Sequence, residues 1–439
     1  MTTLTQHSPP TDVTDWRAWL AYGLSFAAPT AAVNLAGPAA RSTHAAPSAP
    51  RRAGQPALTL TMHAYREERP GARWQALARQ TWPAYRRWFD AEGRTTRPSY
   101  AACRDALAAH LPELLSTWER LTALAASATG ASTDETGRLL SLWCPTPFVT
   151  GCSQAILPGT DPVLVRSYDY DPALFEGVVA STDYSGRRRV LGTSDCLWGL
   201  LDGMNDAGLA VSLTYGGRAG RGPGRTGEGF GIPIVLRYLL ETCATVPEAI
   251  ALLRRVPIAQ CYNISLVDTA GGHATVFVAP GEPALVSSDQ VATNQRLDTV
   301  EDSHLAALLR SPLRHDRLTR LLADRPDREH LVAAFVAPPL HTTDYARGFG
   351  SLYAAAYRPA TGSVEYHWPG RTWTRRFDDP DEVITVEVPD EPAEPAAHRP
   401  GQPRPCRSRG GDPRPGGNRI RGGLLGPARP ERHHRGSAW

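Results

Sequence analysis

The sequence predicts an α+β fold, with antiparallel hairpins at its centre and helices inserted between them in pairs. Short apolar segments separated by turn residues indicate the strands, and segments with apolar residues at helical spacing indicate the helices. The chain has 439 residues, of which 41% are hydrophobic and 21% are charged. This length and composition are typical of a globular protein that buries a large core.

The first 61 residues predict no folded element. They are rich in Ala, Pro, Thr and Ser and have little periodicity, which is typical of disorder. Met62 heads the first segment with a foldable pattern, so residues 1–61 are either a disordered or a misassigned leader. Residues 18–40 are mildly apolar, but the acidic Asp12 and Asp15 before them argue against a secretory signal.

Residues 62–151 are predicted to form a mostly helical arm. From Trp74 to Phe89, aromatic and apolar side chains fall on one helical face. Further helices are expected to begin near Tyr100, Pro112 and Thr133. Pro145 and Pro147 then forbid helix and favour an extended segment. The arm therefore ends in an extended stretch that leads to residues 151 and 152.

Residues 152–390 are predicted to form the main domain, built from hairpins and paired helices. The expected strand pairs are 152–157 with 163–169, 178–182 with 189–192, 197–202 with 209–215, 263–267 with 274–278, and 351–357 with 364–367. Helices are expected at 234–242, at 246–255, near 302–323 and at 328–336. Such a mixture favours helical layers outside stacked sheets.

The net charge of +3 comes from the C-terminal tail. Residues 391–439 hold ten arginines and four acidic residues, so residues 1–390 carry a net charge of −3. The tail is rich in Pro, Gly and Arg and is predicted to be disordered. The acidic body excludes nucleic-acid binding through a basic surface. No run of 18 apolar residues predicts a membrane span.

The cysteines and histidines predict neither a disulfide framework nor a metal site. The seven cysteines are odd in number and show no C-x-x-C spacing, which fits a reducing compartment and hence a cytoplasmic protein. The histidines at 304, 315, 330 and 341 lack ligand spacing. A metal-dependent hydrolase is therefore a weak alternative, and no cofactor is expected.

The junction of Gly151 and Cys152 carries the clearest sign of chemistry. It begins an apolar strand that turns back into a second strand, which carries Arg166 and Asp169. Glycine tolerates the strained backbone that attack on its own carbonyl requires. A cut at this junction would give Cys152 a free amine, whose pKa of roughly 7.7–8.0 suits a general base. One residue would then supply both nucleophile and base; a buried cysteine that only packs is the alternative.

Three further stretches complete the pattern. They are Asp202-Gly203-Met204-Asn205-Asp206-Ala207-Gly208-Leu209, Thr293-Asn294 at a strand end, and Ser311-Pro312-Leu313-Arg314 at a helix start. Taken singly, each has an ordinary explanation, because Asn and Gly form turns and a lone Arg usually lies on a helix surface. In this order along the chain, they indicate a nucleophile, a base and an oxyanion-binding group.

With these motifs the chain resembles the N-terminal-nucleophile hydrolases. The nearest group is the acyl-coenzyme A:6-aminopenicillanate acyltransferase-like family, and the choloylglycine hydrolases are more distant. The resemblance covers roughly residues 62–380 and implies a four-layer αββα sandwich of two antiparallel sheets. It implies that the chain cuts itself after Gly151, so that residues 152–390 become the catalytic domain. The enzyme would then hydrolyse or transfer acyl groups at linear amide bonds.

The resemblance also implies a role for each charged site residue. Arg166 and Asp169 match an R-x-x-D motif, in which the aspartate orients the amine of Cys152. Arg166, close to the thiol, would favour the thiolate. Arg314 matches an arginine that lies near the nucleophile.

The resemblance identifies one donor of the oxyanion hole and leaves the second donor open. Asn294 matches an asparagine that helps to form the oxyanion hole. Bile-salt-type members carry a second asparagine where this chain has Thr214, so the second donor would be Thr214, Tyr215 or a backbone N–H. Acyltransferase-like members usually carry His where this chain has Gln295.

Two classes of function stay open at this point. In the first, the partner is a small acyl amide, with acyl-coenzyme A or an amine acceptor as candidate second substrates. In the second, the chain is an uncleaved and catalytically silent relative that acts as a binding or structural protein. Neither class calls for nucleic acid, a membrane or a cofactor.

Overall fold

The computed structural model describes residues 57–91, 93, 96–146, 150–216, 228–296, 309–343, 345 and 350–389. All of them lie in one compact unit, Met1–Glu391. The second unit, Pro392–Trp439, lies outside the described residues. The predictions of disorder for residues 1–56 and 391–439 therefore concern parts of the chain that are not described.

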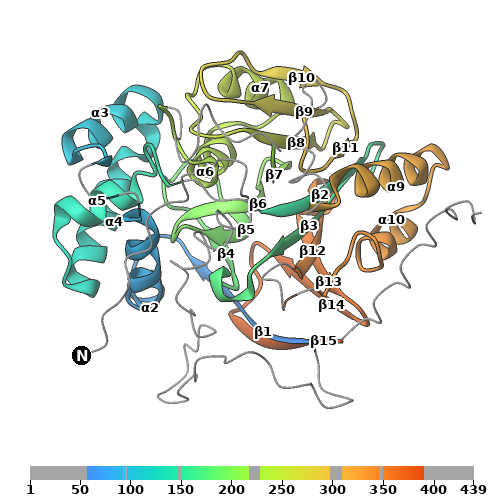
Figure 1. Ribbon diagram of the computed structural model, residues 1–439, viewed down its shortest axis with the longest axis horizontal. Helices are drawn as coiled ribbons and strands as arrows, with labels where there is room; N and C mark the ends of the chain where they lie inside the picture. The colour runs from blue at the N-terminus through green and yellow to red at the C-terminus, as the bar shows by residue number, and fades with distance from the viewer. Residues whose placement is uncertain are drawn as a thin grey trace, which may run out of the picture. The chain divides into compact units, whose positions relative to one another are not determined.

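The described residues form two β-sheets (Figure 1). The larger sheet has the strand order β10-β9-β8-β7-β6-β5-β4-β1-β15, and the smaller has β11-β2-β3-β12-β13-β14. The strands of the larger sheet are β1 (Leu58–Glu67), β4 (Val178–Thr182), β5 (Val190–Asp195), β6 (Gly199–Asn205), β7 (Leu209–Tyr215), β8 (Tyr262–Asp268), β9 (His273–Val278), β10 (Leu285–Ser287) and β15 (Glu382–Val388). Those of the smaller sheet are β2 (Gly151–Leu157), β3 (Val163–Tyr170), β11 (Val291–Ala292), β12 (Gly350–Arg358), β13 (Ser363–Trp368) and β14 (Arg371–Arg376).

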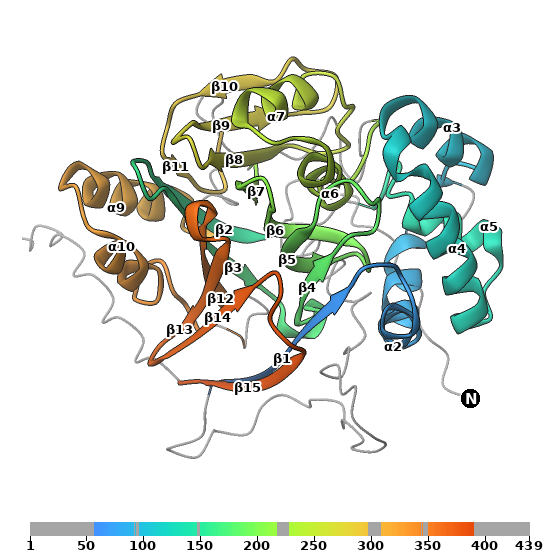
Figure 2. The same ribbon diagram turned by 180° about the vertical axis from the view of Figure 1, so that it is seen from behind.

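Helices cover the outer side of each sheet (Figures 1 and 2). One group shares a hydrophobic core with the larger sheet: α2 (Ala72–Phe89), α3 (Tyr100–His110), α4 (Leu115–Thr129), α5 (Thr133–Leu140), α6 (Ile232–Thr242) and α7 (Val246–Leu253). The helices α9 (Ser311–Ala323) and α10 (Arg328–Phe335) cover the smaller sheet. Short 3-10 turns lie at Pro112–Leu114, Pro172–Leu174 and Pro359–Thr361. Within the described ranges, no helix combines the length and the apolar character needed to cross a membrane.

Three hydrophobic cores separate the four layers. The side chains of the strand β3 alternate between two of these cores. Val163 and Val165 pack against α9 and α10, whereas Leu164 packs between the two sheets. A strand buried on both faces reads as a continuous apolar run, which is how this segment appears in the sequence. The four-layer αββα arrangement is therefore the one that the sequence analysis expects.

The strand β1 differs from the expectation in two ways. It starts at Leu58, four residues before the boundary expected at Met62, so residues 58–61 belong to the fold. It also runs parallel to β4 while pairing antiparallel with β15. The larger sheet is therefore mixed rather than purely antiparallel, and the arm contributes a strand as well as helices. The alternation of Leu58, Leu60 and Met62 is the strand signal that the polar composition of the leader obscured.

The end of the chain also contains more strands than expected. The hairpin of β12 and β13, expected to be the last, is followed by β14 and β15. Each begins with two exposed residues, after which buried and exposed residues alternate. Strands at sheet edges bury only one face and therefore lack the long apolar run that marks the central ones.

Candidate active site

The hairpin of β2 and β3 forms as predicted, and it carries the first three site residues. Cys152 lies directly opposite Tyr168, and both side chains face the core between the sheets. Arg166 is two residues from Tyr168 and therefore shares this face, whereas Asp169 is an odd number of residues away and points to the other face. The R-x-x-D spacing thus sends the guanidinium toward the thiol and the carboxylate toward α9.

The strand β11 brings Asn294 to the same place. It pairs with β2 in antiparallel register, with Val291 opposite Ala155. Continuing this register by three residues sets Asn294 opposite Cys152. The strand β11 itself ends at Ala292, so its pairing with β2 gives the direction of this segment but includes no ladder pair at Asn294.

The side chain of Asn294 binds the backbone on both sides of Gly151. Its Oδ1 accepts the N–H of Cys152 at 2.8 Å, and its Nδ2 donates to the carbonyl of Thr150 at 2.9 Å. The same Nδ2 donates to the carbonyl of Tyr215 at 3.2 Å. Asn294 is fully buried, so these bonds form away from water, where a polar group without partners is costly.

The guanidinium of Arg166 lies against the sulfur of Cys152. Its Nη2 is 3.2 Å from Sγ, and its Nη1 donates to the carbonyl of Leu201 and to Asp202 Oδ2, both at 2.6 Å. Burial alone would lower the pKa of Arg166, but the neighbouring Tyr353, Cys152 and Asp202 raise it well above its ordinary value. Arg166 is therefore a permanent cation beside the thiol.

Asp202 holds Arg166 in this position, a role that the sequence analysis did not find. Asp202 ends the strand expected at 197–202, whereas the strand β6 continues to Asn205, and Asp202 is fully buried within it. Besides Arg166, its carboxylate accepts hydroxyl groups at 2.5–2.7 Å. These hydroxyls belong to Thr193, Tyr353 and Tyr357. A carboxylate inside an apolar strand needs a cation and donors, and this requirement is the signal that could have revealed it.

Asp169 is held on the helix side of the sheet. Its Oδ2 is 3.1 Å from Arg314 Nη1, and its Oδ1 accepts the hydroxyl of Ser351 at 2.7 Å. Burial raises the pKa of Asp169, while the charge of Arg314 opposes the rise. In the intact chain, the N–H of Cys152 is bonded to Asn294 rather than to Asp169. Sequence reasoning found Asp169 but not Ser351.

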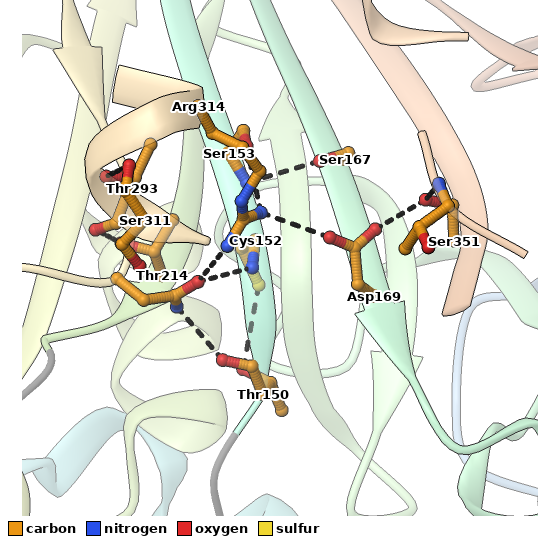
Figure 3. A network of polar contacts seen from close by, with 12 residues as sticks. Thr150, Cys152, Ser153, Ser167, Asp169, Thr214, Thr293, Ser311, Arg314 and Ser351 are labelled. Carbon is orange, nitrogen blue, oxygen red and sulfur yellow. Dashed lines mark hydrogen bonds and ion pairs between the residues drawn. The ribbon is translucent and has the colours of Figure 1, made fainter. Parts of the chain in front are cut away.

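Arg314 joins the two halves of the site. Besides Asp169, it donates to Ser153 Oγ at 3.0 Å and to Asn294 Oδ1 at 2.7 Å. Figure 3 shows it reaching from its helix to Ser153 and Asp169, with Ser351 on the far side of the carboxylate. The side chain is only 3% exposed, and burial lowers its pKa while Asp169 opposes this effect. The alternative of a surface arginine is therefore wrong.

Thr214 reaches the site but does not present a free donor. Its hydroxyl donates to the carbonyl of Thr293 at 3.1 Å, which lies next to Asn294. Thr214 therefore supports the segment that carries Asn294. The structure thus brings together all six predicted side chains, with Thr214 in a supporting place.

No group of three or more His, Cys, Asp or Glu side chains in the described ranges is arranged to hold a metal ion.

Two acids, the buried Glu176 and the partly buried Asp195, lie near Arg166. Glu176 Oε1 accepts the hydroxyl of Tyr85 at 2.5 Å and the N–H of Leu197 at 2.7 Å. Cys196 Sγ is 3.5 Å from Asp195 Oδ2. Burial, together with the negative charge of Glu176, raises the pKa of Asp195 to about 7. Like charges in a buried place make the second ionisation unfavourable.

An Asp195→Asn variant is expected to gain stability relative to the wild type as the pH rises. The folded chain keeps the proton on Asp195 up to about pH 7, whereas the unfolded chain releases it near 3.8. The stability that this proton confers is therefore complete below about pH 4 and is lost by about pH 7. Urea denaturation of both proteins between pH 4 and 8 measures the difference. An exposed control, Asp105→Asn, is expected to show no such trend. A difference in unfolding free energy between Asp195→Asn and the wild type that does not change with pH would contradict the prediction.

The fold and the site together agree with the arrangement that the motifs predict. Two stacked sheets have helices outside both, and a cysteine begins an inner strand next to Arg166, Asp169 and Asn294. Residues 157–373 match the family model described as acyl-coenzyme A:6-aminopenicillanic acid acyl-transferase. The chain is similar to this family, as its motifs predict, and the match indicates an enzyme that acts on amides. The matched range begins just after Cys152 and contains the other site residues.

Solved structures of three such proteins are similar to the chain at low sequence identity. Penicillin V acylase from Agrobacterium tumefaciens is 16% identical, with a TM-score of 0.33, over 51% of this chain and 84% of that one. A mutant conjugated bile acid hydrolase from Clostridium perfringens is 12% identical, with a TM-score of 0.34, over 56% and 100%. The Caenorhabditis elegans ortholog of N-acylethanolamine-hydrolyzing acid amidase is 15% identical, with a TM-score of 0.33, over 48% and 93%. No curated protein matches the chain.

Proposed function

We propose that this chain cuts itself between Gly151 and Cys152 and then acts as a cysteine amidohydrolase or acyltransferase on linear amides. The observation that supports the proposal is that two buried side chains form hydrogen bonds at this junction. Asn294 binds the backbone on both sides of Gly151, and Arg166 donates to the sulfur that would attack. A purely structural cysteine needs neither contact, because it packs as a small apolar side chain.

The first step is an acyl shift within the chain. The thiolate of Cys152 attacks the carbonyl carbon of Gly151, and the bond from this carbon to the nitrogen of Cys152 breaks. The nitrogen takes up the proton that the thiol released and becomes a free amine. Water then hydrolyses the thioester, leaving a carboxylate on Gly151 and a thiol on Cys152.

The cut changes what Asn294 can do. In the intact chain its Nδ2 is bonded to the carbonyl of Thr150. When the segment ending at Gly151 moves away, this donor becomes available to an oxyanion on the substrate. A preorganised donor of this kind supplies a large share of catalysis in acyl transfer.

The cut also exposes Asp169 to the new amine. Gly151 lies directly opposite Asp169 in the hairpin, so its departure opens the space between this carboxylate and Cys152. The bonds from Arg314 and Ser351 keep the carboxylate in place. Asp169 can then accept a hydrogen bond from the amine and orient it toward the thiol.

Turnover uses the same groups in a second acyl transfer. The thiol of Cys152 gives its proton to its own amine and attacks the substrate carbonyl, and the amine then protonates the leaving nitrogen. The resulting thioester passes its acyl group to water or to an acceptor amine. The family name supports an acyl-coenzyme A donor or a penicillin-type amine as partners, and the small acyl amide is the common substrate class.

Intact-mass measurement under denaturing conditions tests the proposal. The wild-type chain is expected to give two fragments that meet between Gly151 and Cys152, whereas a Cys152→Ala variant is expected to stay whole. Hydrolysis of penicillins, N-acyl amino acids and bile-salt amides by the cut protein would then identify the acyl group. Conversion in the presence of an added amine would distinguish transfer from hydrolysis.

One observation favours the second candidate, an uncleaved and catalytically silent relative that acts as a binding or structural protein. Cys152 is completely buried in the intact chain, so no substrate reaches its sulfur before a cut. If the purified wild-type chain remains whole and its thiol does not react, the protein is a binding or structural relative, and the enzyme proposal fails.

A further inference from the structure

A second buried asparagine, Asn263, holds Asn294 in the way that Asn294 holds the junction. It lies on the strand β8, opposite Thr214 of β7. Its Nδ2 donates to the carbonyl of Thr293 at 2.7 Å and to the carbonyl of Gln295 at 2.9 Å. These carbonyls are on the two sides of Asn294.

We propose that Asn263 is a positioning residue that sets Asn294 for both self-cleavage and turnover. The inference rests on the proposed function, because Asn294 acts on the junction first and on the substrate afterwards. Asn263 itself touches neither the thiol nor the scissile bond. Its effect passes entirely through the backbone of residues 293–295.

The sheet alone does not hold Asn294. The strand β11 ends at Ala292, so the ladder to β2 stops before Asn294 is reached. Asn263 and Thr214 replace it, since both donate to the carbonyl of Thr293. Of these two residues, only Asn263 also donates to the carbonyl of Gln295, on the other side of Asn294. Displacement of a catalytic group by about 1 Å can cost roughly a hundredfold in rate.

The side-chain oxygen of Asn263 indicates a role beyond packing. Its Oδ1 has no hydrogen-bond partner in the described part of the chain, although the residue is fully buried. A buried acceptor left unpaired is costly and calls for an explanation. The two hydrogen bonds that its Nδ2 donates to the carbonyls of Thr293 and Gln295 compensate for this cost.

Asn205 provides the contrast. It is equally buried, and its Nδ2 also donates to two carbonyls, those of Leu240 and Cys243. Its Oδ1, however, accepts the N–H groups of Ala207 and Leu209. Every polar atom of Asn205 serves the turn after β6 and the end of α6, away from the site. It is therefore a matched control for Asn263.

The first arm of the test measures self-cleavage. Asn263→Ala is expected to slow the appearance of the two fragments by 10- to 100-fold, measured on the folded fraction by intact mass. In the cut protein, kcat is expected to fall by a similar factor with little change in KM. Asn205→Ala is expected to destabilise the fold without changing the rate of the folded fraction. An equal slowing by both variants would overturn the inference.

The second arm does not depend on cleavage. In the uncut Cys152→Ala chain, the amide at position 152 is protected by Asn294 Oδ1, and hydrogen exchange reports this bond. The amide of Ile156, which bonds the carbonyl of Gln290, is the internal reference. Adding Asn263→Ala is expected to speed exchange at position 152 at least tenfold relative to Ile156, whereas adding Asn205→Ala is not.

The two arms separate two kinds of failure. If the wild-type chain does not cut itself but exchange at position 152 responds to Asn263→Ala, the proposed function fails and the positioning role stands. If exchange at position 152 is unchanged by Asn263→Ala, the positioning role fails, whatever the chain does at the junction.

Discussion

An Asn294→Leu variant is expected to cut itself at least a hundredfold more slowly than the wild-type chain. Leucine branches at the same side-chain carbon, but it neither accepts the N–H of Cys152 nor donates to Thr150. In the intact chain these two bonds position the junction, and misplacement of a reacting group by about 1 Å can cost roughly a hundredfold in rate. Any fraction that is cut is expected to lose roughly 100- to 1,000-fold in kcat toward amides, because one oxyanion donor is then missing.

The time course of fragment formation at fixed pH measures this effect. Asn294→Asp refines it, because the carboxylate can still accept the N–H of Cys152 but has no proton to donate to Thr150. Gln295→Leu removes the adjacent amide side chain, for which no bond to the junction is present, and is expected to change the rate less than threefold. Cleavage of Asn294→Leu at the wild-type rate would exclude Asn294 from the mechanism.

An Arg314→Leu variant is expected to lose about 3–5 kcal/mol of unfolding free energy at neutral pH, and to lose activity as well. Removal of one partner from a buried ion pair leaves the other charge uncompensated, which is strongly destabilising. Asp169 would keep only the bond from Ser351. Ser153 and Asn294 would lose the donors that now hold them.

Chemical denaturation measures the stability, and Arg320→Leu on the same helix is the matched control. Arg320 pairs with Asp316, but their side chains are 65% and 55% exposed, so the loss should stay below about 1 kcal/mol. Adding Asp169→Asn to Arg314→Leu removes the unpaired charge and should restore part of the stability, though not the activity. Equal losses for Arg314→Leu and Arg320→Leu would contradict the buried pair.

The candidate site could be predicted wherever it depends on a local pattern. The hairpin that carries Cys152 and Arg166 follows from two apolar segments and a turn, and the period of two along a strand already implies that Asp169 faces the opposite side. The pairing of the two strands confirms this part of the prediction. The boundary at Met62 was wrong because alternation over a few residues is a weak signal inside a polar leader.

The partners of these residues could not be predicted in the same way. Asp202, Asn263 and Ser351 come from three different strands, and each has an ordinary local explanation in the sequence. Their roles depend on contacts across 30 or more residues of chain, with Arg166, with the backbone next to Asn294 and with Asp169. A buried polar residue in an apolar strand predicts that a partner exists, but not which one.

By itself, then, the sequence determined the α+β class of fold and the hairpin that carries Cys152, Arg166 and Asp169, which follow from short-range patterns: alternation, helical spacing and turn residues. The four-layer arrangement and the expected roles of Asn294 and Arg314 came from the resemblance that the order of the motifs indicates. Only the tertiary structure decided that Asn294 spans the junction, that Arg314 is buried against Asp169, and that Thr214 supports rather than donates. The physical reason is that side chains far apart in the sequence meet only when the two sheets stack, and burial then obliges each polar atom to find a partner.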